Sequence, residues 1–313
     1  MLARSTIGLR SSRDDRAALL PRRSGCAALL TIGLCSSRID DDQRFLPEPA
    51  GDDKLRLGGM ALRNGLLVHG PTHWAAAVRT REGELKMGSG RKPDLGGRAS
   101  EKIPGVRGIT KLAEAMAVIP LVKRALPEAR LPMQDVRTLG SIAGAALLAQ
   151  AIRSTGARTM GREAAVSLVS LAPALLALRG GDLAAYHGVE HKSIAAYEQD
   201  GRAAEADKEH GRCGSNLVAP MLVSAAVGNV AARRAGLRGP AAEATVAVGS
   251  AAVAVEVFAW SERHEGTGLS RALRRPGHEI QRLVGTREPS EAQLEVGRAA
   301  LAEVLRVETA EAA

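Results

Sequence analysis

The chain has 313 residues and a formal net charge of +9, with 43 Lys and Arg residues against 34 Asp and Glu. Aromatic residues make up only 2%, so a core has to be built from Ala, Leu and Val, which suits helices packed through small residues in water or in lipid. The basic excess is compatible with nucleic acid or anionic lipid, but single-strand binding needs aromatic platforms, and nucleic acid is not expected. The three cysteines, Cys26, Cys35 and Cys213, form no disulfide framework and indicate a reducing compartment.

Residues 1–54 are rich in Arg and Ser and differ from the rest of the chain. Their apolar run at 26–35 is too short to span a bilayer. It resembles a weak signal sequence, but no convincing small-residue cleavage site follows. We therefore expect a disordered tail, or a start codon assigned too early.

Residues 55–100 predict a small β-rich unit and a linker. Two short extended segments, Trp74–Thr80 and Glu84–Met87, flank a polar turn that contains Gly83. The pair Gly58–Gly59 is expected to form a plain turn, because no phosphate-loop spacing follows it.

Residues 101–263 are expected to form a helical core. Its first helix carries an apolar stripe of Ile109, Leu112, Ala113 and Met116, and Pro120 is expected to end or kink it. Four Ala-rich apolar segments follow, at 138–152, 164–178, 214–232 and 244–260. They are short and diluted by Ala, Gly, Ser and Asn, so membrane insertion would be marginal. The pattern favours buried helices of a bundle, and membrane spans are the alternative.

Residues 264–313 predict a C-terminal helical tail. Ser290 and Gln293 have the spacing of a capping box at the start of an amphipathic docking helix, for which we expect no catalytic role. The apolar stripe of this helix consists of Leu294, Leu301, Val304 and Leu305. The expected fold is therefore mainly α: an Ala-rich helical bundle, in water or membrane-embedded, with a small β-rich N-terminal unit and a C-terminal amphipathic helix.

The stretch "AYHGVEHKSIAAYEQDG", residues 184–200, carries the chemistry. On a helix, His187 and His191 lie four residues apart on one face, so both imidazoles can reach one metal ion at about 2.0–2.1 Å. Glu190 lies beside this face, where a carboxylate that does not bind the metal can act as a base. Glu198 is about 10 Å further along the helix axis, too far to join the same ion.

Further ligands are expected from the loop "HGRC", through His210 and Cys213. Four ligands would make a closed, structural zinc site, whereas three would leave a position open for catalysis. The sequence does not choose between these alternatives. Solvent-exposed histidines on a polar helix face are the third possibility.

The stretch resembles a bacterial family known as domain of unknown function 1385, described as predicted metal-dependent enzymes. The likeness extends from about residue 55 to residue 306, although Asn64 stands where many relatives have a carboxylate and His69 where they have an arginine. The residues that carry the resemblance are Tyr186, His187, Gly188, Glu190, His191, Lys192, Tyr197, Glu198, His210, Arg212, Cys213, Gly214 and Ser215, with Gly211 at a position where proline is usual.

The resemblance implies an integral membrane protein and names no substrate. We expect a zinc-type metal on His187, His191, His210 and Cys213, with Glu190 as the catalytic residue. Supporting roles around the ligands are expected for Tyr186, Lys192, Glu198 and Arg212. The leading hypothesis is a metal-dependent, hydrolase-like enzyme at the cell membrane that acts on a small molecule or peptide. The alternatives are a non-catalytic membrane scaffold held together by a metal, a basic adaptor on anionic lipid, and a cytoplasmic location.

Overall fold

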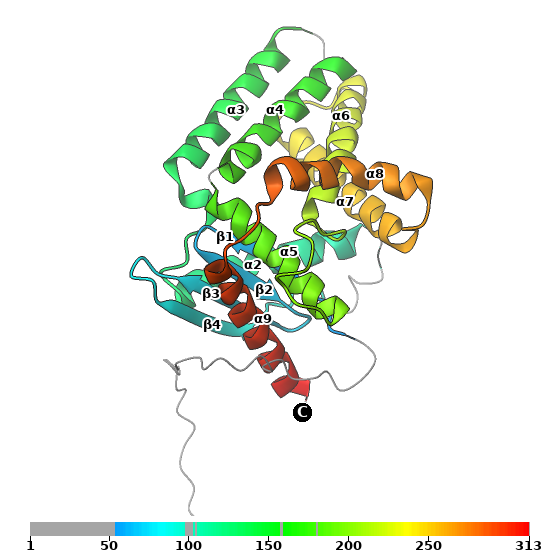
Figure 1. Ribbon diagram of the computed structural model, residues 1–313. Coiled ribbons are helices and arrows are strands. Elements are labelled where there is room, and N and C mark those ends of the chain that lie inside the picture. The colour runs from blue at the N-terminus through cyan, green and yellow to red at the C-terminus, as the bar shows by residue number, and fades with distance from the viewer. Residues whose placement is uncertain (1–53, 98–102, 104, 157–158, 180, 313) are drawn as a thin grey trace, which may run out of the picture. The chain divides into compact units, whose positions relative to one another are not determined.

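The computed structural model describes residues 54–97, 103, 105–156, 159–179 and 181–312. Of the tail expected at 1–54, all but the last residue lies outside the described residues. The helices and strands are labelled in Figure 1.

The predicted β-rich unit is an antiparallel sheet with the strand order β1-β2-β3-β4. Its strands are β1 (Gly58–Leu62), β2 (Gly65–His69), β3 (His73–Arg79) and β4 (Leu85–Arg91). The two expected extended segments correspond to β3 and β4, and Gly83 between them has a φ of +89°. The turn predicted at Gly58–Gly59 is wrong, because these glycines pair with His69 and Val68 inside the sheet.

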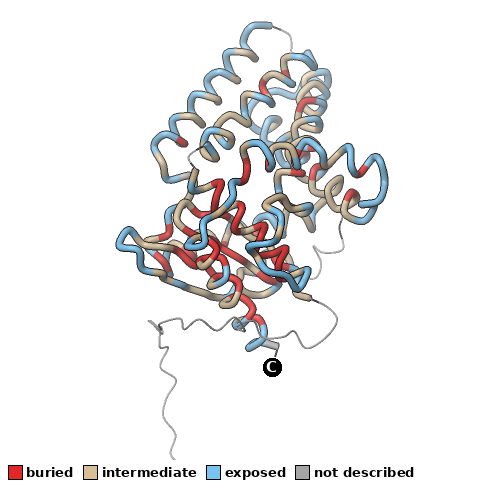
Figure 2. The backbone as a smooth tube through the Cα atoms, viewed as in Figure 1, coloured by how far each residue is buried: buried red, intermediate tan, exposed pale blue. Residues whose placement is uncertain are grey.

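The sheet is the middle of three layers, because successive side chains of a strand point to opposite faces. One face, with Leu66 and Val68, packs against α5 (Asp182–Gln199) and α9 (Glu291–Ala312). The other face, with Leu67 and Trp74, packs against α2 (Val106–Ala125). This unit holds most of the buried residues, as Figure 2 shows.

The helix predicted from the Ile109–Met116 stripe is α2, but the stripe is not its buried face. Leu112 and Met116 are 46% and 55% exposed, whereas Val118 and Val122 are fully buried against the sheet. Pro120 lies inside the helix and does not end it. The C-terminal half of α2 is the part that packs on the sheet, and this depends on tertiary contacts that the local period does not contain.

The remaining helices form the other half of the structure. They are α3 (Val136–Ser154), α4 (Met160–Leu178), α6 (Val218–Arg234), α7 (Pro240–Arg263) and α8 (Gly268–Ile280). Short turns of 3₁₀ helix lie at η1 (Pro132–Gln134) and η2 (Gly214–Leu217), and a π-helical turn follows α8 at η3 (Gln281–Gly285). The four Ala-rich segments are helical, as predicted, and fall in α3, α4, α6 and α7.

These Ala-rich helices are not buried, which corrects the interpretation that the pattern favoured. Three stretches are long and apolar enough to cross a membrane: Met160–Leu178, Gly214–Arg234 and Pro240–Arg263. Only 11%, 22% and 11% of the residues in their most apolar windows are buried. Leu168 and Val223 are 65% and 63% exposed. The helices pack in pairs, α3 on α4 and α6 on α7. Many of their large apolar residues are exposed, and Figure 2 shows these helices mostly in the colours of intermediate and exposed residues.

The predicted docking helix is α9, and all four residues of its apolar stripe are buried against the sheet. The Gln293 Oε1 atom accepts a hydrogen bond from the Ser290 amide at 3.0 Å, which is one half of the predicted capping box. The Gln293 amide bonds the Ser290 carbonyl instead of its hydroxyl.

His69 ends β2 and lies across Gly58 of β1, where an added Cβ atom would come within 2.8 Å of the imidazole. Burial, with a smaller contribution from the positive charge of Lys92, lowers the pKa of His69 from 6.5 to about 4. The folded chain therefore keeps this imidazole neutral in a pH range where the unfolded chain protonates it.

We predict that His69 makes the protein less stable as the pH falls from about 6.5 to about 4. Only the unfolded chain gains a proton on His69 in this range, which lowers the free energy of unfolding by about 3 kcal/mol in total. The melting temperature of the His69→Gln variant should therefore fall less between pH 7 and pH 4.5 than that of the wild type. Equal falls in the two proteins would contradict the prediction.

Candidate metal centre

The site is built on α5, a helix buried on several sides. Tyr186, Val189 and Tyr197 point into the core shared with the sheet and α9. Gly297 of α9 faces Val189 and Ser193 so closely that a side chain there would clash. The helix axis is therefore fixed, and with it the direction of the face that carries the histidines.

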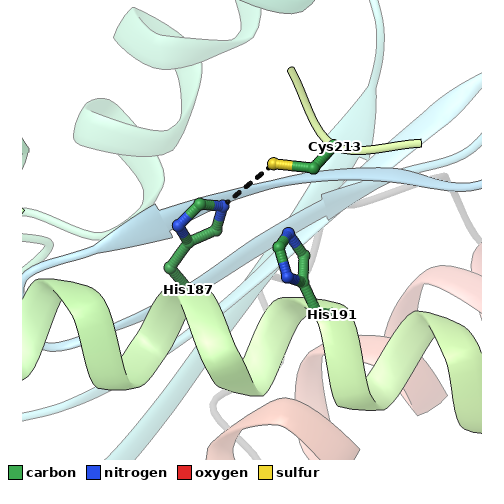
Figure 3. Close-up of side chains that lie close together, drawn as sticks. All are labelled: His187, His191 and Cys213. Carbon is green, nitrogen blue, oxygen red and sulfur yellow. Dashed lines mark hydrogen bonds between the residues drawn. The ribbon is translucent and has the colours of Figure 1, made fainter. Parts of the chain in front are cut away.

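His187 and His191 lie on this face with their ring centroids 4.4 Å apart. Cys213 reaches them from the loop that leads from α5 to η2, and Figure 3 shows the three side chains converging. The Cys213 Sγ atom lies 3.4 Å from His187 Nε2, and one ligand atom from each of the three residues lies within 4.8 Å of the other two. We call these three residues the metal cluster.

Two backbone carbonyls orient the histidines. The Nδ1 atom of His187 lies 2.8 Å from the Gly285 carbonyl oxygen, and that of His191 lies 2.6 Å from the Lys208 carbonyl oxygen. A carbonyl only accepts, so each Nδ1 donates its proton to the carbonyl, which leaves the Nε2 atom as the nitrogen that could bind a metal. The His191 Nε2 atom is buried without a hydrogen-bond partner. This donor set fits a divalent transition metal, because metal-binding imidazoles usually donate their second nitrogen to such an acceptor.

Each of these carbonyls is itself held in place. The Lys192 ammonium donates to the carbonyls of Ala204 and Ala206 at 3.2 and 2.7 Å, which fixes the segment leading to Lys208. The segment after Gly285 docks on α5, where the Arg287 amide donates to the Ala184 carbonyl at 2.9 Å. Lys192 is expected to support the ligands, and this contact is the route by which it would do so.

Gln281 contributes to the site although the sequence pattern did not indicate it. Its side chain is fully buried. The Oε1 atom accepts from the His210 amide at 2.8 Å, and Nε2 donates to the Ser215 hydroxyl at 2.8 Å. It therefore joins both sides of Cys213 to η3, whose last residue, Gly285, faces His187. A lone glutamine about 70 residues after the loop gives no sequence signal for this role.

His210 lies beside the metal cluster and is not among its three residues. Its ring centroid is 5.8 Å from that of His191. Its Nε2 atom is 3.3 Å from Glu198 Oε2, and its Nδ1 atom accepts from the Arg212 amide at 3.3 Å. Burial lowers the pKa of His210, and the negative charge of Glu190 opposes this. The structure thus brings together three of the four expected ligands, and both nitrogens of the fourth are engaged elsewhere.

The other residues expected to support the ligands are Glu198, Arg212 and Tyr186, and each contacts a different part of the structure. Glu198 pairs with Arg212 as well as with His210, so it holds the "HGRC" loop to the end of α5. Burial, with a contribution from Arg56, lowers the pKa of Arg212. Tyr186 belongs to the hydrophobic core, and burial raises its pKa.

Glu190 is half-buried and passes over Gly59 of β1. A Cβ atom on Gly59 would lie only 2.8 Å from Glu190 Cγ and 3.0 Å from its carboxylate carbon. The side chain of Glu190 makes no hydrogen bond or ion pair with the described residues, although its charge acts on His210.

The family model described as "Protein of unknown function (DUF1385)" matches residues 182–307. Residues 182–307 are therefore similar to that family. The match confirms the resemblance seen in the sequence and contains α5, the "HGRC" loop and all three residues of the metal cluster. Neither the curated proteins nor the solved structures compared with the chain gave a match.

We predict that Gly188→Ala weakens the metal cluster. A Cβ atom on Gly188 would clash with the Arg287 carbonyl oxygen, so the segment that carries Gly285 has to move away from α5. His187 then loses the acceptor of its Nδ1 proton, and loss of such a partner weakens metal binding about 10- to 100-fold. Zinc affinity measured by competition with a chromogenic chelator is the test.

Gly214→Ala is the matched control, because Gly214 adjoins Cys213 but has open space where its Cβ atom would be. It should leave the zinc affinity unchanged. Unaltered affinity in both variants would show that the Gly285 carbonyl does not orient His187.

Proposed function

We propose that the protein is a membrane-associated, metal-dependent enzyme of the hydrolytic type. His187, His191 and Cys213 would hold the ion, and Glu190 would act as the base. The observation that carries this proposal is the buried His191 Nε2 atom, which has no hydrogen-bond partner and lies with His187 Nε2 and Cys213 Sγ around one point.

The chemistry of the donors favours zinc. Two imidazole nitrogens and one thiolate suit a borderline-soft transition metal, whereas magnesium and calcium prefer oxygen ligands. Catalytic zinc sites have three protein ligands and keep a fourth position open, which matches the number of donors here. When bound there, zinc would supply a Lewis acid and lower the pKa of water in the site.

Glu190 has the position and the freedom that a base needs. It follows His187 by three residues and precedes His191, so it projects beside the metal cluster and not into it. No described cation neutralises it, and Gly59 leaves room for its carboxylate. The chain thus holds a proton acceptor next to the place where the ion would bind.

A membrane location is supported by the three apolar helices and their exposed leucines and valines. One end of each of these three helices lies towards the "HGRC" loop and α5. These ends are Leu178 of α4, Gly214 of the η2–α6 stretch and Arg263 of α7. Arginines flank the apolar segments, and their side chains can extend to a membrane interface. They are Arg137, Arg153, Arg179, Arg233 and Arg234. They lie at both ends, so they fix no orientation.

A second candidate function is a structural metal that joins α5 to the "HGRC" loop without catalysis. His210 favours it, because its ring lies only 5.8 Å from His191. A change of its rotamer would add a fourth ligand and close the site. The role of Glu190 separates the two functions.

We predict that protein purified without chelators carries about one equivalent of zinc. The His187→Ala/His191→Ala double variant should lose it, because two of three donors are gone. Glu190→Gln should keep the zinc and the melting temperature, yet lose chelator-sensitive hydrolysis across a panel of chromogenic esters, phosphodiesters and peptides. Elemental analysis and the panel are the measurements.

Absence of any transition metal from the wild-type protein would overturn the proposal. Loss of zinc in Glu190→Gln would mean that Glu190 orients the ligands. Unchanged hydrolysis in that variant would exclude Glu190 as the base. Absence of chelator-sensitive hydrolysis from the wild-type protein would favour the structural role.

We predict that the protein stays in the membrane pellet after an alkaline carbonate wash. Helices rich in small residues can pack against one another in lipid while their large apolar side chains face the acyl chains. Release by the wash would indicate a peripheral protein. Recovery in the soluble fraction without a wash would show that another protein surface or a second copy covers α4, α6 and α7.

A further inference from the structure

A cavity of about 590 Å³ lies next to the loop that carries Cys213. Four arginines and two glutamates line it: Arg56, Arg212, Arg263, Arg274, Glu262 and Glu265. They come from the segment before β1, the "HGRC" loop, the end of α7 and α8. Guanidinium groups from four separate parts of the chain therefore converge on one space.

The carboxylates do not saturate these arginines. Arg56 bonds Glu262 through a single nitrogen, Nη2, at 3.0 and 3.1 Å. Arg274 uses Nη1 for Glu265 and Nη2 for the Gly211 carbonyl. The side chain of Arg263 makes no hydrogen bond or ion pair with any described residue. Each guanidinium has five N–H donors, so several donors and at least one uncompensated positive charge remain for a ligand.

The side chain of Arg274 is only 15% exposed, and that of Arg212 is 32% exposed. Packing therefore holds both in place before any ligand arrives, which reduces the entropy lost on binding. Arg274 is also fixed by the Gly211 carbonyl, at 2.9 Å. That contact ties the wall of the cavity to the loop that carries Cys213.

The "HGRC" loop links this cavity to the metal cluster. Arg212 lines the cavity, and the next residue, Cys213, belongs to the metal cluster. The Arg212 amide donates to His210 Nδ1 at 3.3 Å, and the ring of His210 is 5.8 Å from that of His191. A ligand in the cavity would thus lie against the loop that carries Cys213.

We propose that this arginine cavity binds a phosphate group of the substrate and places the adjoining part of the molecule beside the metal cluster. The inference rests on the proposed function, because it takes the metal cluster as the place of reaction. Guanidinium forks match phosphate oxygens in pairs and carry a permanent charge. Several forks around one space suit a group with more oxygens and more charge than a single carboxylate.

Two kinds of substrate carry a phosphate group that these arginines would bind in the same way: a phospholipid and a soluble phosphate ester. Residues 259–263 close α7, one of the three helices able to cross a membrane, so the cavity opens where a lipid headgroup would lie. A soluble phosphate ester would make the same contacts with the arginines. The lipid would differ from the soluble ester in its acyl chains, which would lie along α7.

The test is calorimetric titration of the full chain, loaded with zinc, in an uncharged detergent. The probes are inorganic phosphate, glycerol phosphate, short-chain phosphatidic acid and short-chain phosphatidylcholine. Phosphatidic acid should bind and phosphatidylcholine should bind much more weakly. Arg56→Gln and Arg263→Gln should each weaken binding about ten-fold or more, as expected when a charged hydrogen bond is lost. Their zinc content should stay unchanged, because neither residue contacts the metal cluster.

Arg234→Gln is the control, since it removes the same charge from the far end of α6 and should bind like the wild type. Equal binding of glycerol phosphate and phosphatidic acid would support the proposal with a soluble ester as the source. Preference for phosphatidic acid would support it with a lipid as the source. Equal binding of the two lipids, no binding of any phosphate probe, or equal weakening by Arg234→Gln would overturn it. If the protein binds phosphate but takes up no zinc, the cavity is still a phosphate site, but the proposed metal-dependent function is wrong.

Discussion

The close approach of other backbone segments to α5 is the constraint on which the site depends. Glycines make this approach possible on three sides. Gly59 of β1 leaves room for Glu190, Gly297 of α9 lets that helix reach Val189, and Gly188 of α5 itself admits the Arg287 carbonyl. A methyl group at any of them would push a neighbour away from α5. Such contacts explain how a chain with 2% aromatic residues holds a helix rigidly: small residues bring the backbone close where large side chains are scarce.

This packing turns three separate segments into one arrangement of donors. The histidines are fixed by the helix period, and their protonation is fixed by two carbonyls that arrive from elsewhere, at Lys208 and Gly285. Cys213 is fixed by a loop whose two sides are joined through the buried Gln281. The donors already lie close together in the folded chain, so binding of an ion there would require little reorganisation. A site built in this way is more selective for geometry than a set of histidines on an exposed helix face would be.

The parts of the fold that depend on local patterns could be predicted from the sequence. The helix carrying His187 and His191, the strands beside Gly83 and the buried stripe of α9 all follow from the spacing of residues along one element. The errors lie where distant contacts decide. Gly58–Gly59 was expected in a turn because glycine is common there, but the pair is in a strand where His69 and Glu190 need the space. The role of His210 as a ligand stays a prediction: sequence spacing indicated its loop, but its contact with Glu198 cannot be seen in the sequence.

The two halves of the structure differ in whether their apolar side chains are buried. The candidate site lies where the two halves meet. The sheet, α2, α5 and α9 bury their apolar side chains against one another. The helices α4, α6 and α7 leave theirs exposed, which in water would cost free energy for every leucine and valine involved. Some charged groups within this second half are nevertheless paired: Arg153 pairs with the buried Glu163, and Glu256 accepts from the Gly105 amide at the start of α2. A chain that pairs its charges and exposes its apolar residues is arranged as lipid requires. The metal cluster and the arginine cavity, at the ends of these helices, would then lie at the level of the headgroups, where a polar reaction centre can act on an amphiphilic molecule without burying its own charges in hydrocarbon.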